Sequence, residues 1–253
     1  MKEKGGILLR NVIQCLRTCI VAILLSILLW IVLLAAGGYQ ACQRALQERS
    51  IADMIRQIQQ QSSYTELSQI PQLYIDAVLA AEDPWFYRHN GINVIAIADA
   101  LVRDLKAKEW VAGGSTITQQ LCKNQFFTQK KTFTRKFAEL FMVQAVERCC
   151  SKDIILELYI NSIYYGSGYY TLADASTGYF DKVPASMNAW ECTLLAGIPN
   201  APSAYAPTVS PELALARQQQ VLAAMERYGY LARAEVEAII QLCPDSFGSS
   251  QSN

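Results

Sequence analysis

The residues best suited to chemistry lie in the run AEDPWFYRHNG, residues 81–91. This run holds two adjacent carboxylates, Glu82 and Asp83, three aromatic rings and the single histidine of the chain, His89. An apolar segment at helical spacing precedes it, and Pro84 disfavours helical geometry at Asp83, so we expect a helix to end there. A carboxylate at a helix C-terminus beside aromatic rings should have a raised pKa, which suits a general base. The alternative for Glu82 is a solvated helix end, and this run alone does not exclude it.

A second candidate site is the loop GGSTITQQ, residues 113–120. Two glycines before a helix leave backbone N–H groups free at its positive end, where an anion can bind. Thr116 and Gln119 have the spacing of a capping box that opens a helix over residues 117–123. The side chains of Gln119 and Gln120 offer donors and acceptors that suit sugar hydroxyls. The nucleotide-binding pattern GxxxxGK[ST] does not occur here.

Basic residues are concentrated between positions 103 and 136, where eight of them against two acidic residues give a local net charge of +6. This concentration favours an anionic ligand or an anionic membrane surface, although a solvated face is the alternative for any single lysine. The eight are Arg103, Lys106, Lys108, Lys123, Lys130, Lys131, Arg135 and Lys136.

The last two basic residues belong to a third candidate site. Arg135, Lys136 and Glu139 are spaced to share one helix face. A carboxylate between two cations stays ionised, whereas Glu82 is expected to have a raised pKa. Two carboxylates that differ in this way can take separate roles in acid–base chemistry.

The N-terminal region indicates a membrane anchor. Residues 19–36 form an uncharged apolar run of 18 residues, just long enough to span a bilayer. Basic residues dominate the segment before it, which predicts a cytoplasmic N-terminus and an exported C-terminal domain. A cleaved signal peptide is the alternative. The chain carries 22 basic and 22 acidic residues, so no global charge favours nucleic acid.

The cysteines do not define a metal centre. No CxxC spacing occurs and there is one histidine, so a zinc site is not indicated. We interpret the six cysteines after the apolar run as buried thiols rather than disulfides: Cys42, Cys122, Cys149, Cys150, Cys192 and Cys243.

The elements that must position these residues are helical, and no alternating strand pattern is visible. The sequence predicts a mainly α domain with further helices over 94–105, 134–148, 151–161, 184–196 and 211–228. The expected organisation is a basic cytoplasmic segment 1–18, a transmembrane helix 19–38, a helical stalk 39–70, a catalytic domain 71–243 and a disordered tail 244–253.

Taken together, the motifs resemble those of the peptidoglycan glycosyltransferases, family 51 of the glycosyltransferases. The resemblance rests on five segments in order, between residue 74 and about residue 240. They are Glu82-Asp83-x-x-Phe86-x-x-His89-x-Gly91; Gly113 to Gln120 followed by Lys123; Arg135-Lys136-x-x-Glu139; Tyr159-Ile160-Asn161 with Tyr164-Tyr165-Gly166; and Leu194 to Pro202. Ile160, where leucine is usual, and Thr171-Leu172, where glycine-isoleucine is common, depart from the pattern. Since no transpeptidase segment follows, the chain looks like a monofunctional transglycosylase.

The resemblance implies a lysozyme-like, two-lobed helical fold and the polymerisation of lipid-linked disaccharide-peptide (lipid II) into glycan strands. It implies Glu82 as the general base and Glu139 as a second catalytic carboxylate. Substrate-binding residues would be Ser115, Thr116, Gln119, Gln120, Lys123, Lys131, Arg135, Lys136 and Asn161. Site-shaping residues would be Asp83, Phe86, His89, Gly91, Gly113 and Gly114.

The resemblance also bears on cofactors, partners and location. It implies no organic cofactor and allows a divalent cation, Mg²⁺ or Mn²⁺, at Glu139. The expected partners are lipid II, the nascent glycan, the membrane and other cell-wall synthesis proteins, at the bacterial inner membrane.

Two other functions remain open from the sequence. A membrane-anchored muramidase would also use paired carboxylates, although the basic cluster speaks against a hydrolase. A non-catalytic scaffold of a cell-wall complex is the other, and the presence of both Glu82 and Glu139 argues against it. The pair Phe126-Phe127 is either a membrane-dipping patch or part of the core.

Overall fold

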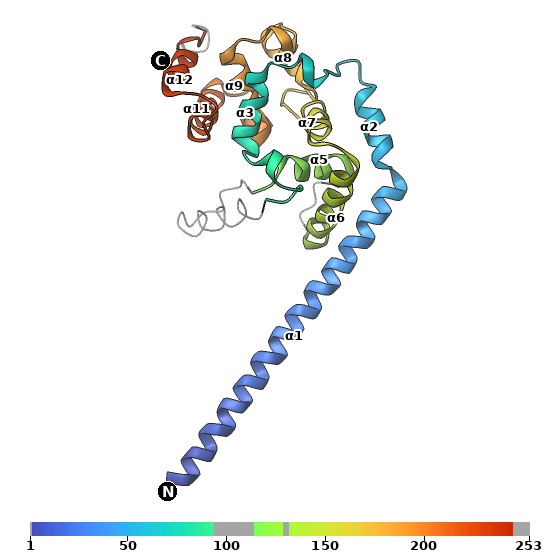
Figure 1. The fold of residues 1–253 in the computed structure, drawn as a ribbon, viewed down its shortest axis with the longest axis vertical. Helices are drawn as coiled ribbons and strands as arrows, with labels where there is room; N and C mark the ends of the chain where they lie inside the picture. The colour runs from blue at the N-terminus through green and yellow to red at the C-terminus, as the bar shows by residue number, and fades with distance from the viewer. Residues whose placement is uncertain (1, 94–113, 129–131, 245–253) are drawn as a thin grey trace.

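The computed structural model describes residues 2–93, 114–128 and 132–244. Within these ranges the chain is helical and has no strand, which confirms the prediction of a mainly α protein (Figure 1). The helix predicted over 94–105 lies outside the described residues, as does the tail after Pro244. The described helices are α1 (Lys2–Glu48), α2 (Ile51–Gln59), α3 (Gln72–Glu82), α5 (Ile117–Phe126), α6 (Phe133–Cys149), α7 (Lys152–Ile160), α8 (Leu172–Phe180), α9 (Ala189–Gly197), α10 (Pro202–Tyr205), α11 (Pro211–Arg227) and α12 (Arg233–Gln241).

Helix α1 is a single unbroken rod that projects away from the rest of the molecule (Figure 1). Its part Ile13–Glu48 is long and apolar enough to cross a membrane, and the mean hydropathy of its apolar window is 3.1. The apolar side chains of this part, such as Leu24 and Leu29, are exposed. This arrangement confirms the predicted apolar N-terminal helix and is that of a membrane-anchored protein.

The C-terminal part of α1 packs against α6, and a glycine makes the close approach possible. A Cβ atom on Gly38 would lie 2.5 Å from the Cβ atom of Phe137 and 2.9 Å from the backbone nitrogen of Ala138. Two edge-to-face ring pairs extend the contact: Trp30 with Phe133, and Tyr39 with Phe141. The face of α6 that carries Phe133, Phe137 and Phe141 therefore meets α1. The domain core is met by a second face of α6 that includes Met142 and Val146.

The chain bends after α1, and the hydroxyl of Ser50 caps the first turn of α2 by accepting from the backbone nitrogen of Asp53. The predicted helical stalk over 39–70 is therefore helical only in parts. Residues 60–66 are not helical, and a short 3-10 turn, η1 (Leu67–Gln69), follows. The amide of Asn161 holds this segment, because it bonds both backbone polar groups of Thr65.

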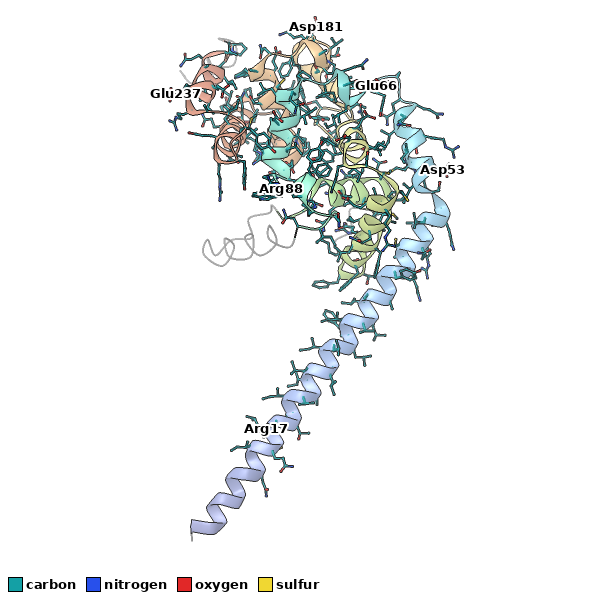
Figure 2. The ribbon with its side chains drawn as sticks, viewed as in Figure 1. Arg17, Asp53, Glu66, Arg88, Asp181 and Glu237 are labelled. Atoms are coloured by element: carbon teal, nitrogen blue, oxygen red, sulfur yellow. The ribbon has the colours of Figure 1, made fainter. Side chains whose placement is uncertain are left out.

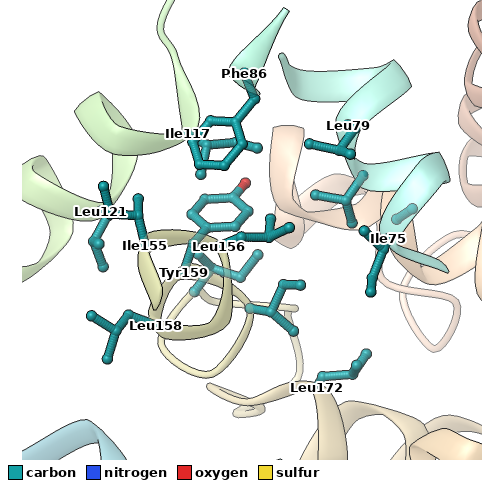
Figure 3. Close-up of a cluster of buried hydrophobic side chains, with 14 of the residues drawn as sticks. Ile75, Leu79, Phe86, Ile117, Leu121, Ile155, Leu156, Leu158, Tyr159 and Leu172 are labelled. Carbon is teal, nitrogen blue, oxygen red and sulfur yellow. The ribbon is translucent and has the colours of Figure 1, made fainter. Parts of the chain in front are cut away.

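The main core lies where α3, α5 and α7 meet (Figure 3). Leu79 of α3, Leu121 of α5 and Leu156 of α7 contribute buried side chains to it. Helix α7 begins as predicted, because the hydroxyl of Ser151 caps it by accepting from the backbone nitrogen of Ile154. The rings of Phe126 and Phe127 pack against this core, so the structure assigns them to packing.

A second core joins α9, α11 and α12. Trp190 and Leu194 of α9 meet Leu222 of α11 and Ile239 of α12. Helix α11 matches the prediction for 211–228, while the region predicted as one helix over 184–196 splits into the 3-10 turn η3 (Pro184–Ser186) and α9.

The cysteines interpreted as buried thiols differ in their exposure. Four of the six are buried: Cys42, Cys122, Cys150 and Cys192. Cys243 is half-buried, and Cys149 is exposed, which contradicts the interpretation for Cys149. Cys149 ends α6, and its side chain faces outward while its neighbour Cys150 is buried.

Candidate active site

Glu82 is the last residue of α3, and the helix ends at Asp83 as predicted. The side chain of Glu82 is only 7% exposed. Burial raises the pKa of the Glu82 carboxyl group above its ordinary value, which confirms the expected direction. The hydrogen bond from Gln120 and the charges of Arg217 and Lys123 act against this effect and offset part of it.

The two oxygens of Glu82 have different surroundings. Oε2 accepts a hydrogen bond of 2.7 Å from Nε2 of Gln120. Oε1 is buried and accepts no hydrogen bond from the described residues, and the cation recorded beside it is Nη2 of Arg217 at 3.7 Å. A buried carboxylate oxygen without a donor has a lone pair available to a substrate proton.

Gln120 is oriented by a neighbour in α7. The hydroxyl of Tyr159 donates to Oε1 of Gln120 across 3.3 Å, which directs the NH₂ group of the amide to Glu82. Burial keeps the pKa of Tyr159 well above its ordinary value, so the hydroxyl retains its proton. Sequence reasoning did not identify Tyr159 as part of this arrangement.

Gln119 has a different role from its neighbour. Its side chain accepts from the backbone nitrogen of Thr116, while the hydroxyl of Thr116 accepts from the backbone nitrogen of Gln119. This reciprocal pair confirms the predicted capping box. Both residues are buried in this cap, so the structure gives no support to their predicted contact with substrate.

Asp83 and His89 join the two sides of the site. Nδ1 of His89 accepts from the backbone nitrogen of Gly91 across 3.1 Å, so the ring proton lies on Nε2 and is donated to Asp83 at 2.9 Å. Asp83 also accepts from the backbone nitrogen of Ile117 in the first turn of α5. These bonds tie the end of α3 to the start of α5 and thereby fix the relative positions of Glu82 and Gln120.

Gly91 and Phe86 pack beside this link. Gly91 has a φ of +79°, and a Cβ atom there would overlap with Cγ1 of Val143 in α6. Its carbonyl oxygen accepts from the hydroxyl of Thr116 across 2.7 Å. The ring of Phe86 is buried, with Nζ of Lys152 4.3 Å from its centroid.

The third motif forms a buried ionic cluster on α6. Glu139 is 1% exposed, and its two carboxylate oxygens are paired with Arg135 and, at 3.2 Å, with Nζ of Lys136. Arg135 is 17% exposed and Lys136 is 48% exposed. The spacing therefore predicted correctly that these three side chains share one face.

Lys123 of α5 brings the two carboxylate sites together. Burial lowers the pKa of Lys123, and the carboxylates of Glu139 and Glu82 both act to raise it. The charge of Lys123 therefore acts on both carboxylates. Arg217 of α11 is a further cation at this site that sequence reasoning missed, because no motif around it signalled a partner in α3.

Several predicted site residues are placed elsewhere or lie outside the described residues. Asn161 is fully buried, and its amide nitrogen donates to two backbone carbonyls, those of Thr65 and Glu157, so it holds the chain rather than a ligand. Ser115 is exposed and Gly114 half-buried at the entry to α5. Gly113 and Lys131 lie outside the described residues, as do Arg103, Lys106, Lys108 and Lys130 of the basic cluster.

The donor set does not fit a divalent cation at Glu139. Both of its oxygens are already paired with cations, and the described parts of the chain contain no group of three or more metal-ligating side chains. We therefore derive no step through a metal ion.

Comparison with known proteins identifies the family of the chain. The family described as Transglycosylase matches residues 48–226. Penicillin-binding protein 1A of Neisseria gonorrhoeae is 44% identical over 65% of this chain and 21% of its own length, and penicillin-binding protein 1F of Bacillus subtilis is 41% identical over 69% and 25%. The crystal structure of penicillin-binding protein 1A from Haemophilus influenzae covers 72% of this chain and 17% of that chain, with 22% identity and a TM-score of 0.42. The chain thus spans about a fifth to a quarter of the curated relatives it matches. Because the family model matches more than half of the chain, the chain belongs to the transglycosylase family.

Proposed function

We propose that this protein is a peptidoglycan glycosyltransferase that joins lipid-linked disaccharide-peptide units into glycan strands. The observation that carries the proposal is the buried Oε1 of Glu82, which accepts no hydrogen bond from any residue that the structure describes, together with the charge of Lys123 that acts on this carboxylate. A base with a raised pKa and a cation for a leaving phosphate are the two requirements of such a transfer.

In the proposed reaction, Glu82 accepts the proton of the 4-hydroxyl group of the acceptor sugar. The acceptor oxygen forms a bond to the anomeric carbon of the lipid-linked growing chain. The bond from that carbon to the pyrophosphate oxygen breaks, and undecaprenyl pyrophosphate leaves with the bonding electron pair. A single displacement of this kind inverts the anomeric centre.

The cations of the site would stabilise the departing pyrophosphate. Lys123 is partly desolvated, which strengthens its interaction with an anion. Arg135 and Lys136 are held by Glu139, so this carboxylate would act by positioning them. The charge that develops on the leaving group would then meet groups that are already in place.

The N-terminal membrane anchor favours a substrate that is itself held in a membrane. A protein tethered beside a lipid-borne substrate meets it at a high effective concentration. We propose that the protein lies in the bacterial inner membrane with its N-terminus in the cytoplasm, because basic residues such as Arg17 precede the apolar part of α1. Lipid II and the nascent glycan would be its substrates, and other cell-wall synthesis proteins its partners.

The test is to incubate the full chain in detergent with purified lipid-linked disaccharide-peptide and to separate the products. Polymer that a muramidase can digest is the expected result. Glu82→Gln should lower the rate by about 10²–10⁴-fold, whereas Glu66→Gln, at an exposed carboxylate, should not. Release of a soluble disaccharide-peptide would indicate a hydrolase, and absence of any product would indicate a scaffold; either result would overturn the proposal.

A further inference from the structure

A cavity of about 480 Å³ opens beside α3. Ile75, Asp76 and Leu79 of α3 contribute to its wall. Other elements complete it with Tyr87, Asp153 of α7, and Tyr230, which follows α11. None of the residues that we place in the active site lines this cavity, so it is a separate feature, named here the α3–α7 pocket.

Two carboxylates of the α3–α7 pocket have no counter-ion among the residues that the structure describes. Oδ1 of Asp76 accepts from Nε2 of Gln72 at 2.8 Å, and Oδ1 of Asp153 accepts from the hydroxyl of Tyr87 at 2.9 Å. Neither aspartate forms an ion pair with any residue that the structure describes, and the second oxygen of each accepts no hydrogen bond from those residues. The pocket therefore presents two negative charges to whatever enters it.

The two cations adjacent in sequence to pocket residues are engaged elsewhere. Lys152, next to Asp153, pairs with Glu147 at 2.8 Å. Arg88, next to Tyr87, stacks on Trp85 with its guanidinium carbon 4.7 Å from the ring centroid (Arg88 is labelled in Figure 2). Lys152 is thus neutralised by another carboxylate, whereas Arg88 keeps its charge near Tyr230 and offsets only part of the negative charge of the pocket.

The rest of the lining suits a cation on an apolar stem. Ile75 and Leu79 supply a buried aliphatic wall. Burial raises the pKa of Tyr87 to about 12, and it raises the pKa of Tyr230, so both rings stay neutral at physiological pH. Neutral tyrosine rings attract a cation through their faces, and an aliphatic wall covers the methylene groups behind it.

We propose that the α3–α7 pocket binds the side chain of a lysine or arginine presented by a partner protein. Charge complementarity favours this occupant over a sugar, because a neutral sugar would leave both carboxylates without a counter-ion. The volume lies within the range of ligand-binding pockets. Tyr87 and Asp153 are exposed at the rim, so an extended segment of another chain can reach the pocket.

The first experiment measures binding of a short peptide to the full chain in detergent by ligand-observed NMR titration. The probe is acetyl-Gly-Arg-Gly-amide, and its matched control replaces arginine with the uncharged isostere citrulline. The arginine peptide should bind, with an affinity that falls as salt is added, and the citrulline peptide should not. Equal binding of the two peptides would overturn the proposal, as would preferential binding of a disaccharide or of a stem peptide with a free amine.

The second experiment locates the site with isosteric variants. Asp76→Asn and Asp153→Asn should each weaken binding of the arginine peptide by about fivefold. Glu237→Gln, which removes an exposed carboxylate from α12, is the matched control and should bind as the unmodified protein does. Thermal unfolding checks that each variant is folded. Unchanged affinity in both aspartate variants would place the ligand elsewhere and reject the proposal.

This inference does not depend on the proposed function. Neither aspartate belongs to the proposed catalytic machinery, so both variants should polymerise lipid-linked substrate at the rate of the unmodified protein. The peptide titration and the polymerisation assay can therefore fail separately, and each failure identifies the proposal that is wrong.

Discussion

The amide of Gln120 donates to one oxygen of Glu82 across 2.7 Å, and no donor within the described parts of the chain reaches the other oxygen of that carboxylate. The bond stabilises the charged form of Glu82, so it limits how far burial can raise the pKa. Gln120 thus adjusts the basicity of a group to which it donates only one hydrogen bond.

This relationship predicts a shift in the pH dependence of the reaction. Gln120→Leu removes a donor that favours the carboxylate, so the pKa of Glu82 should rise further. The acidic limb of the profile of kcat/KM against pH should move to higher pH, because the base must lose its proton before it can act. Tyr159→Phe, which frees the amide to rotate, should move the limb in the same direction by a smaller amount. An unchanged acidic limb in Gln120→Leu would show that Glu82 is not the group that titrates.

The raised pKa of Glu82 also predicts a cost in stability. The folded protein binds the Glu82 proton more tightly than the unfolded chain does. Protonation of Glu82 therefore adds to the free energy of unfolding, and this contribution is fully present below the ordinary carboxyl pKa of about 4.3. It is lost as the pH rises through the raised pKa. Glu82→Gln should therefore unfold at a higher temperature than the unmodified protein at neutral pH, and the difference should vanish near pH ~4. Thermal unfolding in detergent across this pH range measures it, and a variant that is less stable at neutral pH would contradict the argument.

The α6 cluster predicts a loss of both stability and activity in Glu139→Gln. The substitution leaves Arg135 and Lys136 without their anion, and a hydrogen bond between charged groups is worth about 1.5–3 kcal/mol. Lys136 is half exposed, so water replaces part of its loss and the lower end of the range is expected. Urea unfolding gives the change in free energy of unfolding. Glu237→Gln breaks an exposed pair with Arg233 and is the matched control, expected to change little.

The close crossing of α1 and α6 predicts that a larger side chain at position 38 strongly disturbs the packing of the two helices. Gly38→Val would place a side chain within the space of Phe137 and force α1 away from α6. Spin-label distances between the two helices should lengthen, and the thermal midpoint should fall. Ala36→Val enlarges the side chain at an exposed position of α1 and should leave both quantities unchanged. If both variants behaved alike, the close approach at Gly38 would not matter for the docking of α1.

The sequence identified the parts of the site that follow from local spacing. The end of α3 at Asp83 was predictable from Pro84, and the shared face of Arg135 and Glu139 from their separation of four residues. The capping box at Thr116 was also predictable, because its two bonds join residues three positions apart.

The parts that could not be predicted depend on contacts between distant segments. Gln119 and Gln120 are adjacent and of the same type, yet one caps a helix and the other faces Glu82, since successive residues of a helix point about 100° apart. Only the position of α5 against α3 decides which of the two glutamines faces Glu82. The partnership of Arg217 with Glu82 likewise requires the packing of α11 against α3, for which local spacing holds no signal.

The contact between α6 and α1 could not be predicted for a related reason. Phe137 and Phe141 are large apolar side chains of that helix, so a pattern of spacing assigns them to the core. In the structure a separate helix, α1, packs against them and leaves Phe141 partly exposed. An apolar stripe identifies a surface that must be covered, whereas the tertiary arrangement decides what covers it.

Because α1 is continuous, its length sets the rotational orientation of the domain about the helix axis as well as the height of the domain above the bilayer. Because the helix runs without a break from its apolar part to its crossing with α6, it couples rotation within the membrane to rotation of the whole domain. One residue added before Gly37 would lift the domain by about 1.5 Å and turn it by about 100° relative to the bilayer-embedded part. The length of α1 therefore sets the direction from which a ligand that moves in the plane of the membrane meets the side of the protein that carries Glu82.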